Sequence, residues 1–313
     1  MHVESVPAAV PRWRAPTLSP RLFRGVALAA VTMLVLIVAT GATVRLTGSG
    51  LGCHHWPGCQ RDQFLPAKGF HSEVEFSNRI LSLFTVLSTL ALALGAWRTR
   101  GAGRGVKLLA LGVLAGTLGQ APLGAITVYY NLNPYLVIAH MLLSLAVLGL
   151  GVLVLLEATR LERGGATPLP PLARAGGAAL LASVSALVVS GAFATAAGRF
   201  PGSSGTTVVP RLGSFYPSVY WHVRAVAAFG IVFCLLAGWA WRERRRFPWL
   251  LRGCAGLLAI LLAQMAIGEI QYRTYGHVPW WLVLVHVAVA GALFGWTVGL
   301  VARLWRPVAV GRT

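Results

Sequence analysis

Eight runs of about 20 apolar residues recur along the chain, and they constrain its fold more than any other feature. A helix needs about 20 residues to cross the roughly 30 Å hydrocarbon core of a bilayer. Hydrophobic residues make up 56% of the chain and charged residues only 11%, which is too little charge to cover a soluble surface of this size. We therefore predict an all-α integral membrane protein with eight spans, at residues 23–44, 76–97, 107–128, 136–157, 174–197, 219–241, 249–271 and 281–304.

The basic residues, which give the chain a formal charge of +19, follow the same division into spans. If every apolar run crosses the membrane, nineteen of the 27 lysines and arginines fall in the terminal segments and loops on one side. Cytoplasmic loops of membrane proteins carry such an excess, so both termini are predicted to be cytoplasmic. The basic run at 242–246 is then a topology signal that contacts membrane lipid, and we expect no nucleic-acid partner.

An internal duplication divides the eight spans into two similar halves. Residues 120–126 (QAPLGAI) match residues 264–270 (QMAIGEI) at an offset of 144, and the same offset relates Asn78 to His222. A histidine near the start of the last span of each half follows at an offset of 146. Because each half holds an even number of spans, both copies insert in the same orientation. We predict two four-helix bundles related by a pseudo-twofold axis along the membrane normal.

The linker between the halves carries Gly164, Gly165 and three prolines, which favour a break between domains. The first 20 residues are polar and Pro-rich, which is typical of a disordered tail. The predicted organisation is a cytoplasmic tail, an N-terminal four-helix half, a cytoplasmic linker, a C-terminal four-helix half and a second tail, at residues 1–20, 21–160, 161–173, 174–306 and 307–313.

Three histidines lie within apolar runs, where a polar side chain is costly and commonly functional. Two of them, His222 and His286, both open spans that run inward from the same side, so we expect them at similar depth in one bundle. Two imidazoles on facing helices can clamp a planar macrocycle as axial ligands of its iron. A haem is the favoured ligand of this pair, with interhelical hydrogen bonds as the alternative. Zinc is disfavoured because no third ligand lies at that level.

The first half departs from its copy at the matching positions. His140 remains, but Asn78 replaces the second histidine, and an amide is a poor iron ligand. Glu75 lies one helical turn before Asn78 on the same face and has no acidic counterpart in the second half. Its carboxylate either pairs with Arg79, its i+4 neighbour, or lies beside a bound substrate.

Two further sets of residues near the outer ends of the spans each have more than one interpretation. Arg45, Arg79 and Arg224 either extend to the membrane interface or bind the propionates of a haem. Cys53 and Cys59 flank HHWPG in the first outer loop, where an oxidising environment favours a disulfide. The alternatives for this loop are a zinc ion bound by the two cysteines with the intervening histidines, and a redox-active pair that exchanges with a partner thiol.

Taken together, these residues resemble the haem A synthase family over nearly the whole chain, from Gly41 past His286. The most specific matches are GATVRLTGSGLGC (41–53), WPGC (56–59) and EFSNR (75–79), with the histidines that open the fourth, sixth and eighth spans. The Ala-, Gly- and Arg-rich composition suits a bacterial, actinobacterial-type member. The family motif in the second span is Glu-x-x-His-Arg, so this chain departs from it by placing Asn78 where the motif has histidine.

The resemblance implies an enzyme of the bacterial cell membrane that oxidises a methyl group of haem O to a formyl group. By the match, His222 and His286 would hold the iron of a haem b cofactor, and His140 would hold the iron of the substrate haem O. Glu75 would be the catalytic carboxylate, while Asn78 would donate a hydrogen bond or leave the substrate iron five-coordinate.

The resemblance also implies that Cys53 and Cys59 form the family's disulfide in the first outer loop. The expected partners are haem O as substrate, a haem O synthase as its donor, and an electron donor that the sequence does not identify. The main alternative function is a bis-histidine di-haem cytochrome that only transfers electrons, and Asn78 argues against it because it breaks one histidine pair. A transporter is a weaker alternative, since the intramembrane polar residues gather near one face.

Overall fold

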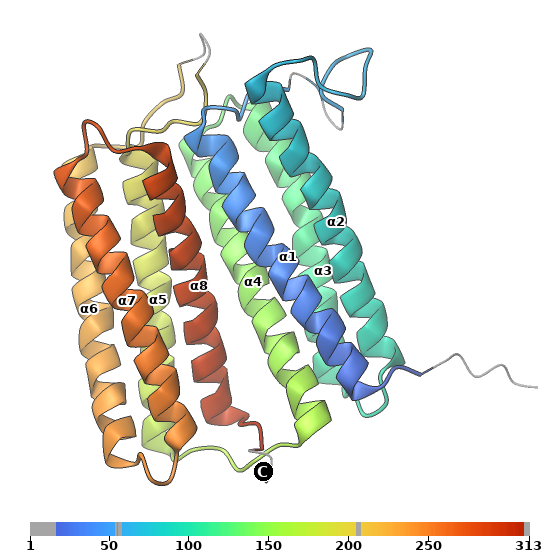
Figure 1. Ribbon diagram of the computed structural model, residues 1–313, viewed down its shortest axis with the longest axis vertical. Coiled ribbons are helices and arrows are strands. Elements are labelled where there is room, and N and C mark those ends of the chain that lie inside the picture. The colour runs from blue at the N-terminus through green and yellow to red at the C-terminus, as the bar shows by residue number, and fades with distance from the viewer. Residues whose placement is uncertain (1–16, 54, 56–57, 205–207, 310–313) are drawn as a thin grey trace, which may run out of the picture.

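The computed structural model describes residues 17–53, 55, 58–204 and 208–309 (Figure 1). Within these residues it contains eight α-helices and no strand. The first four are α1 (Pro20–Leu46), α2 (Phe70–Arg98), α3 (Arg104–Tyr129) and α4 (Pro134–Arg163). The second four are α5 (Pro171–Ala197), α6 (Phe215–Arg242), α7 (Pro248–Arg273) and α8 (Trp280–Trp305).

Each predicted span lies inside one of these helices, and all eight helices are long and apolar enough to cross a membrane. The helices begin a few residues before the predicted spans because residues that favour helix N-termini precede the apolar runs. Prolines occupy one of the first two positions of four helices, where their missing N–H needs no partner. The side chains of Ser19 and Asn133 accept hydrogen bonds from the first turns of α1 and α4.

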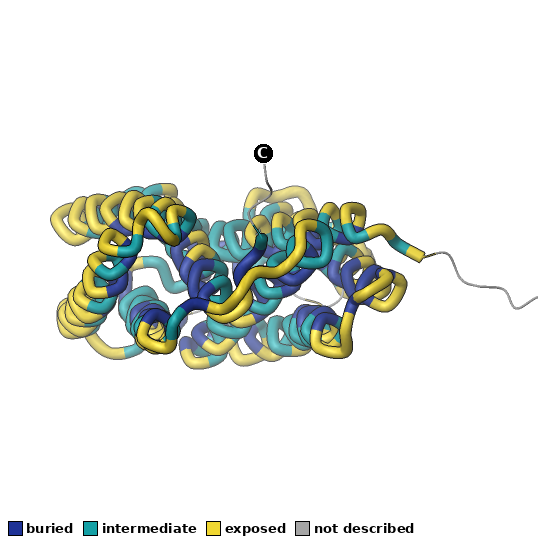
Figure 2. The backbone as a smooth tube through the Cα atoms, turned by 90° about the horizontal axis from the view of Figure 1, so that it is seen from below, coloured by how far each residue is buried: buried dark blue, intermediate teal, exposed yellow. Residues whose placement is uncertain are grey.

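The surface is that of a membrane protein, because large apolar side chains face outward along the helices. Leu235, Trp221 and Ile231 are 72%, 65% and 64% exposed, and a soluble protein rarely exposes apolar side chains over so wide a surface. Figure 2 shows buried residues concentrated inside the helix groups and exposed residues around the rim. The chain is thus a multi-pass integral membrane protein with eight spans, as the sequence predicted.

The helices form two groups of four, α1–α4 and α5–α8, which lie side by side (Figure 1). α8 lies between them and contacts both α4 and α1, while α5 contacts α4. One hydrophobic core runs through both groups and includes Phe23, Leu148, Leu180 and Leu257, all fully buried or nearly so. Because α8 and the shared core join the two groups, the predicted domain boundaries stay a prediction.

We call the two ends of the molecule the disulfide end, which carries the long loop after α1, and the linker end, which carries the chain between α4 and α5. The C-terminal segment lies at the linker end, where Ala166 donates a backbone hydrogen bond to Pro307. The helix-free linker, at 164–170, is shorter than predicted. Residues 18–20 of the predicted tail lie against the first half, since Leu18 donates to the Arg98 carbonyl and α1 begins at Pro20; residues 1–16 lie outside the described residues.

At the disulfide end, the long loops of the two halves are joined by backbone pairing that the sequence did not predict. Gly50 donates to the Gly202 carbonyl at 2.8 Å, and Ser204 donates to the Gly48 carbonyl at 3.1 Å. Gly48 and Gly202 have φ values of 71° and 111°, which only glycine adopts readily. This pairing fixes the two loops against each other above the helices that carry the intramembrane histidines.

Candidate functional site: two matching histidine pockets

The histidines of α4 and α8 occupy matching environments, which supports the predicted duplication. The Gln120 side chain donates to the His140 carbonyl at 3.3 Å, and Gln264 donates to the His286 carbonyl at 3.0 Å. Each imidazole lies against a glycine of the preceding helix: a Cβ added at Gly124 would lie 3.5 Å from His140 Cε1, and the corresponding distance at Gly268 is 3.3 Å from His286 Cε1. Glutamine, glycine and histidine therefore form one unit that occurs twice.

The two units also share unsatisfied polar atoms. Within the described part of the chain, His140 Nδ1 and His286 Nδ1 are buried without a hydrogen-bond partner, and so are the side-chain oxygens of Gln120 and Gln264. A buried polar atom without a partner costs about 1–3 kcal/mol. Orphaned atoms at equivalent positions in both halves suit pockets that are completed by a bound group rather than by protein alone.

The second half carries its two intramembrane histidines on α6 and α8. His222 and His286 influence each other electrostatically, and their pairing on one ligand stays a prediction. His222 Nδ1 shares a hydrogen bond of 3.0 Å with the Ser190 hydroxyl of α5, which leaves Nε2 available to a ligand. The ring lies against Gly191, where an added Cβ would be 3.0 Å from Cε1. This arrangement suits a bis-histidine haem site. In addition, α6 and α7 contact each other less than α2 and α3 do, so the second bundle is packed less tightly between these two helices.

The first half keeps the scaffold of this pocket but fills it differently. Asn78 Oδ1 accepts a hydrogen bond of 2.8 Å from the Thr40 hydroxyl of α1, at the place where Ser190 contacts His222. At Gly41, the counterpart of Gly191, no atom of the described residues lies within 4 Å of an added Cβ. The space that the His222 ring occupies in the second half is thus open beside Gly41. These hydroxyl–glycine pairs were missed by the sequence reasoning, although TGA (40–42) and SGA (190–192) match at an offset of 150.

Glu75 forms the ion pair that was one of its two predicted interpretations. Its carboxylate accepts from Arg79 at 2.6 Å and from the Cys53 backbone N–H at 2.8 Å, and the residue is 5% exposed. Arg79 also donates to the carbonyls of His55 and Gly58, each at 2.6 Å. The pair therefore holds the first outer loop over the first-half pocket, one helical turn beyond Asn78.

Cys53 and Cys59 are joined by a disulfide within this loop. Their sulfurs are therefore not available for the alternative zinc site, and His54 lies outside the described residues. No group of three or more potential metal-binding His, Cys, Asp or Glu side chains occurs in the described part of the chain. The other two cysteines, Cys234 and Cys254, are free.

The three arginines considered as propionate partners differ in how they are placed. The Arg45 guanidinium donates to the carbonyls of Phe200 and Thr195, at 3.2 and 3.0 Å, and so ties α1 to the second half. Arg79 is engaged by the disulfide loop. Arg224, two residues after His222, is exposed and stacks over Tyr220 at 3.5 Å from the ring centroid.

A polar junction at the same end was also missed. His71, at the start of α2, shares hydrogen bonds of 3.0 Å with Ser49 through Nδ1 and with Ser204 through Nε2. The imidazole thus bridges the outer loops of the two halves. Nothing in the sequence around His71 distinguishes it from a surface histidine.

Comparison with known proteins places this chain in a family. The model of the COX15-CtaA family, described as cytochrome oxidase assembly protein, matches residues 24–72 and 67–298. A heme A synthase of Symbiobacterium thermophilum is 29% identical over 265 residues, which cover 80% of this chain and 85% of that protein. A heme A synthase of Lysinibacillus sphaericus is 36% identical over 128 residues, and the match covers 40% of this chain and 41% of that protein. A protoheme IX farnesyltransferase of Thermus thermophilus is 29% identical over 83% of this chain, but only 45% of that protein is matched.

Proposed function

Because the chain belongs to the COX15-CtaA family of cytochrome oxidase assembly proteins, we propose that it is a haem A synthase that oxidises a methyl group of haem O to a formyl group. The observation that carries this proposal is the inequality of two otherwise matching pockets. One pocket pairs His222 with His286, while the other pairs His140 with Asn78 and an open space beside Gly41. A permanent cofactor needs firm binding of its iron by two ligands, whereas a substrate needs a site that leaves room for reaction and release.

In this proposal the second half holds haem b through His222 and His286. Two imidazoles would hold the iron of a bound haem firmly, as suits a permanent cofactor. Ser190 fixes the orientation of the His222 ring, and Gly191 and Gly268 let both rings lie close to the neighbouring helices. Glycines lie beneath the rings, and His286 Nδ1 has no partner among the described residues. Both features are expected of a pocket that holds a bound macrocycle rather than of a core filled by apolar side chains.

The first half receives haem O, with His140 as its one imidazole ligand. Asn78 cannot substitute for the missing histidine, because its oxygen is already engaged by Thr40. One axial face of the substrate iron is therefore left without a protein ligand. When haem O is bound, its iron together with dioxygen and electrons supplies the oxidising power that attack on a methyl C–H bond requires.

Glu75 is the proposed catalytic carboxylate at this pocket. It lies one turn from Asn78, and its hydrogen bonds from Arg79 and the Cys53 N–H fix both oxygens. A fixed carboxylate can accept a proton or stabilise positive charge near the reacting carbon. The same bonds also position the disulfide loop as a cover over the pocket, which excludes water.

Charged side chains at the disulfide end would bind the haem propionates. Arg224 is the best placed of the three proposed residues, because its guanidinium is exposed beside the second-half pocket. Arg45 and Arg79 would have to exchange backbone carbonyls for a propionate, so their proposed contribution is to hold the loops that frame the pockets.

The proposed partner is an enzyme that supplies haem O. The matched region makes up less than half of a Thermus thermophilus protein named protoheme IX farnesyltransferase, so in that protein the counterpart of this chain is fused to further sequence. A fused farnesyltransferase supports direct transfer of a farnesylated haem to this chain. We place the protein in the bacterial cell membrane with the linker end, which carries most of the basic residues, in the cytoplasm.

Coexpression with a haem O synthase, followed by chromatography of the extracted haems, tests this function. We expect haem A or a hydroxylated intermediate to appear at the expense of haem O. If haem O accumulates unchanged while the protein carries haem, the proposal fails and the chain is better described as the alternative, an electron-transfer cytochrome. An inactive His140→Ala variant that retains haem b is the matched control, because it should remove only the substrate site.

A further inference from the structure

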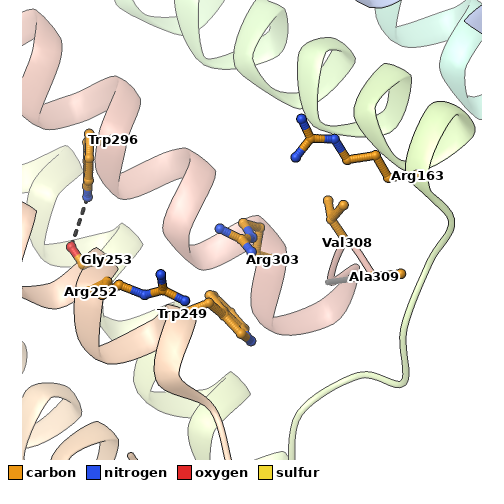
Figure 3. Close-up of a pocket in the computed structure, with 8 residues that line it drawn as sticks. All are labelled: Arg163, Trp249, Arg252, Gly253, Trp296, Arg303, Val308 and Ala309. Carbon is orange, nitrogen blue, oxygen red and sulfur yellow. Dashed lines mark hydrogen bonds between the residues drawn. The ribbon is translucent and has the colours of Figure 1, made fainter. Parts of the chain in front are cut away.

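A cationic pocket lies at the linker end, far along the helices from the histidine pockets. It has a volume of about 430 Å³ and is lined by Arg163 at the end of α4, Trp249 and Arg252 at the start of α7, and Trp296 and Arg303 on α8 (Figure 3). The indole N–H of Trp296 donates to the Gly253 carbonyl at 2.9 Å, which holds this wall of the pocket together. The pocket therefore opens between the two halves at one surface of the membrane.

The pocket contains three guanidinium groups, and none of the described residues that line it is acidic. Arg252 and Arg303 repel each other, and the buried Arg303 Nε has no hydrogen-bond partner among the described residues. The Arg303 guanidinium lies over the Trp249 ring at 4.2 Å from its centroid, which compensates only part of this cost. Such a cluster is stable when an anion lies among the guanidinium groups.

The acidic side chains of the neighbouring helix α4 are already engaged. Glu162 pairs with Arg24 of α1, and Glu157 pairs with Arg160 and with Arg306. Among the described residues, no carboxylate forms an ion pair with any of the three pocket arginines. The protein itself therefore does not neutralise this pocket in the part of the chain that the structure describes.

The duplication provides an internal comparison. The offset of 146 that relates His140 to His286 also relates Glu157 to Arg303. Glu157 lines a pocket of about 390 Å³ with Arg160 and Arg306, and its hydrogen bonds raise the pKa of Arg306. This second linker-end pocket thus carries its own carboxylate, Glu157, whereas the cationic pocket has Arg303 at the equivalent position.

We propose that this pocket binds the phosphodiester headgroup of an anionic membrane phospholipid. Guanidinium groups bind phosphate oxygens bidentately, and basic pockets between membrane helices bind acidic lipid headgroups. The position suits a lipid rather than a soluble anion for two reasons. Trp249 and Trp296 are side chains typical of the membrane interface. Farther along α7, Ala259 and Ala263 continue the helix face that carries Arg252 and are exposed where an acyl chain would lie.

Native mass spectrometry of the detergent-purified protein with added phosphatidylglycerol tests the proposal. The variant Arg163→Gln/Arg252→Gln removes the two exposed arginines and leaves the half-buried Arg303 in place. We expect phosphatidylglycerol to bind this variant about 30-fold more weakly, since each basic residue near anionic lipid contributes roughly fivefold. The control Arg100→Gln/Arg104→Gln removes two exposed arginines from the same end of the first half and should bind like the wild type.

Three results would overturn the proposal. Equal binding of phosphatidylglycerol by the pocket variant and the control variant would show that these arginines do not form a site. Equal retention of phosphatidylcholine and phosphatidylglycerol by the wild-type protein would show that the negative charge is not recognised. Displacement of the lipid by low millimolar inorganic phosphate would assign the pocket to a soluble anion. An unchanged elution volume and haem spectrum of the variant would establish that it is folded.

Discussion

Replacing Asn78 with histidine should convert the proposed substrate pocket into a copy of the cofactor pocket. The structure offers the new imidazole both a place and a hydrogen bond. No atom of the described residues lies within 4 Å of a Cβ added at Gly41, and the Thr40 hydroxyl lies where Ser190 holds His222. The haem in the first half should therefore change from high-spin to low-spin as its iron gains a second imidazole.

The size of the effect follows from the same contacts. The hydrogen bond from Thr40 is exchanged rather than lost, so the thermal unfolding midpoint should change little. The retained hydrogen bond, worth about 1 kcal/mol, would favour the state in which the new imidazole is bound to the iron by roughly fivefold. Conversion of haem O needs that side of the iron to be free, so it should fall by at least about fivefold.

Electron paramagnetic resonance of the purified variant, together with chromatography of its haems after coexpression with a haem O synthase, measures both effects. The control Asn78→Ala removes the amide without supplying a ligand and should leave the substrate haem high-spin. A histidine variant that keeps the high-spin signal and wild-type conversion would refute the assignment of the open face to Asn78 and Gly41.

Three further predictions concern the other proposed residues. His286→Ala should abolish the low-spin haem b spectrum because it removes one of two axial ligands; an unchanged spectrum would remove His286 from the site. Glu75→Gln keeps an acceptor for the Cys53 N–H but loses the charge, so haem O conversion should fall by about 100-fold or more while haem b content stays constant. Wild-type conversion by that variant would leave Glu75 a structural residue that holds the loop. Gly268→Ala places a Cβ 3.3 Å from His286 Cε1 and should shift the haem b spectrum and lower stability by about 1–3 kcal/mol, whereas Gly238→Ala, with no atom within 4 Å, should do neither.

The features that could be predicted from the sequence are those that depend on local composition or on repetition. Helix existence followed from the lengths of the apolar runs, because a bilayer requires that length wherever the chain crosses it. The matching environments of His140 and His286 followed from the duplicated glutamine and glycine, since one local unit folds the same way twice.

What the sequence did not reveal depends on contacts between distant segments. The Thr40 and Ser190 hydroxyls have an offset of 150 rather than 144, because the outer loops of the two halves differ in length. Arg45 was considered for a propionate, yet its partners are backbone carbonyls about 150 residues away, which carry no side-chain signal. Backbone partners of this kind can be identified only when the two outer loops are placed against each other.

The inequality of the two pockets is the central claim, and the most direct test is the electron paramagnetic resonance spectrum of the wild-type protein loaded with haem b and haem O. We predict one low-spin signal from the pair His222 and His286, which persists in His140→Ala, and one high-spin signal that disappears in that variant. Two low-spin signals, or a low-spin signal lost with His140, would contradict the assignment of one cofactor pocket and one substrate pocket.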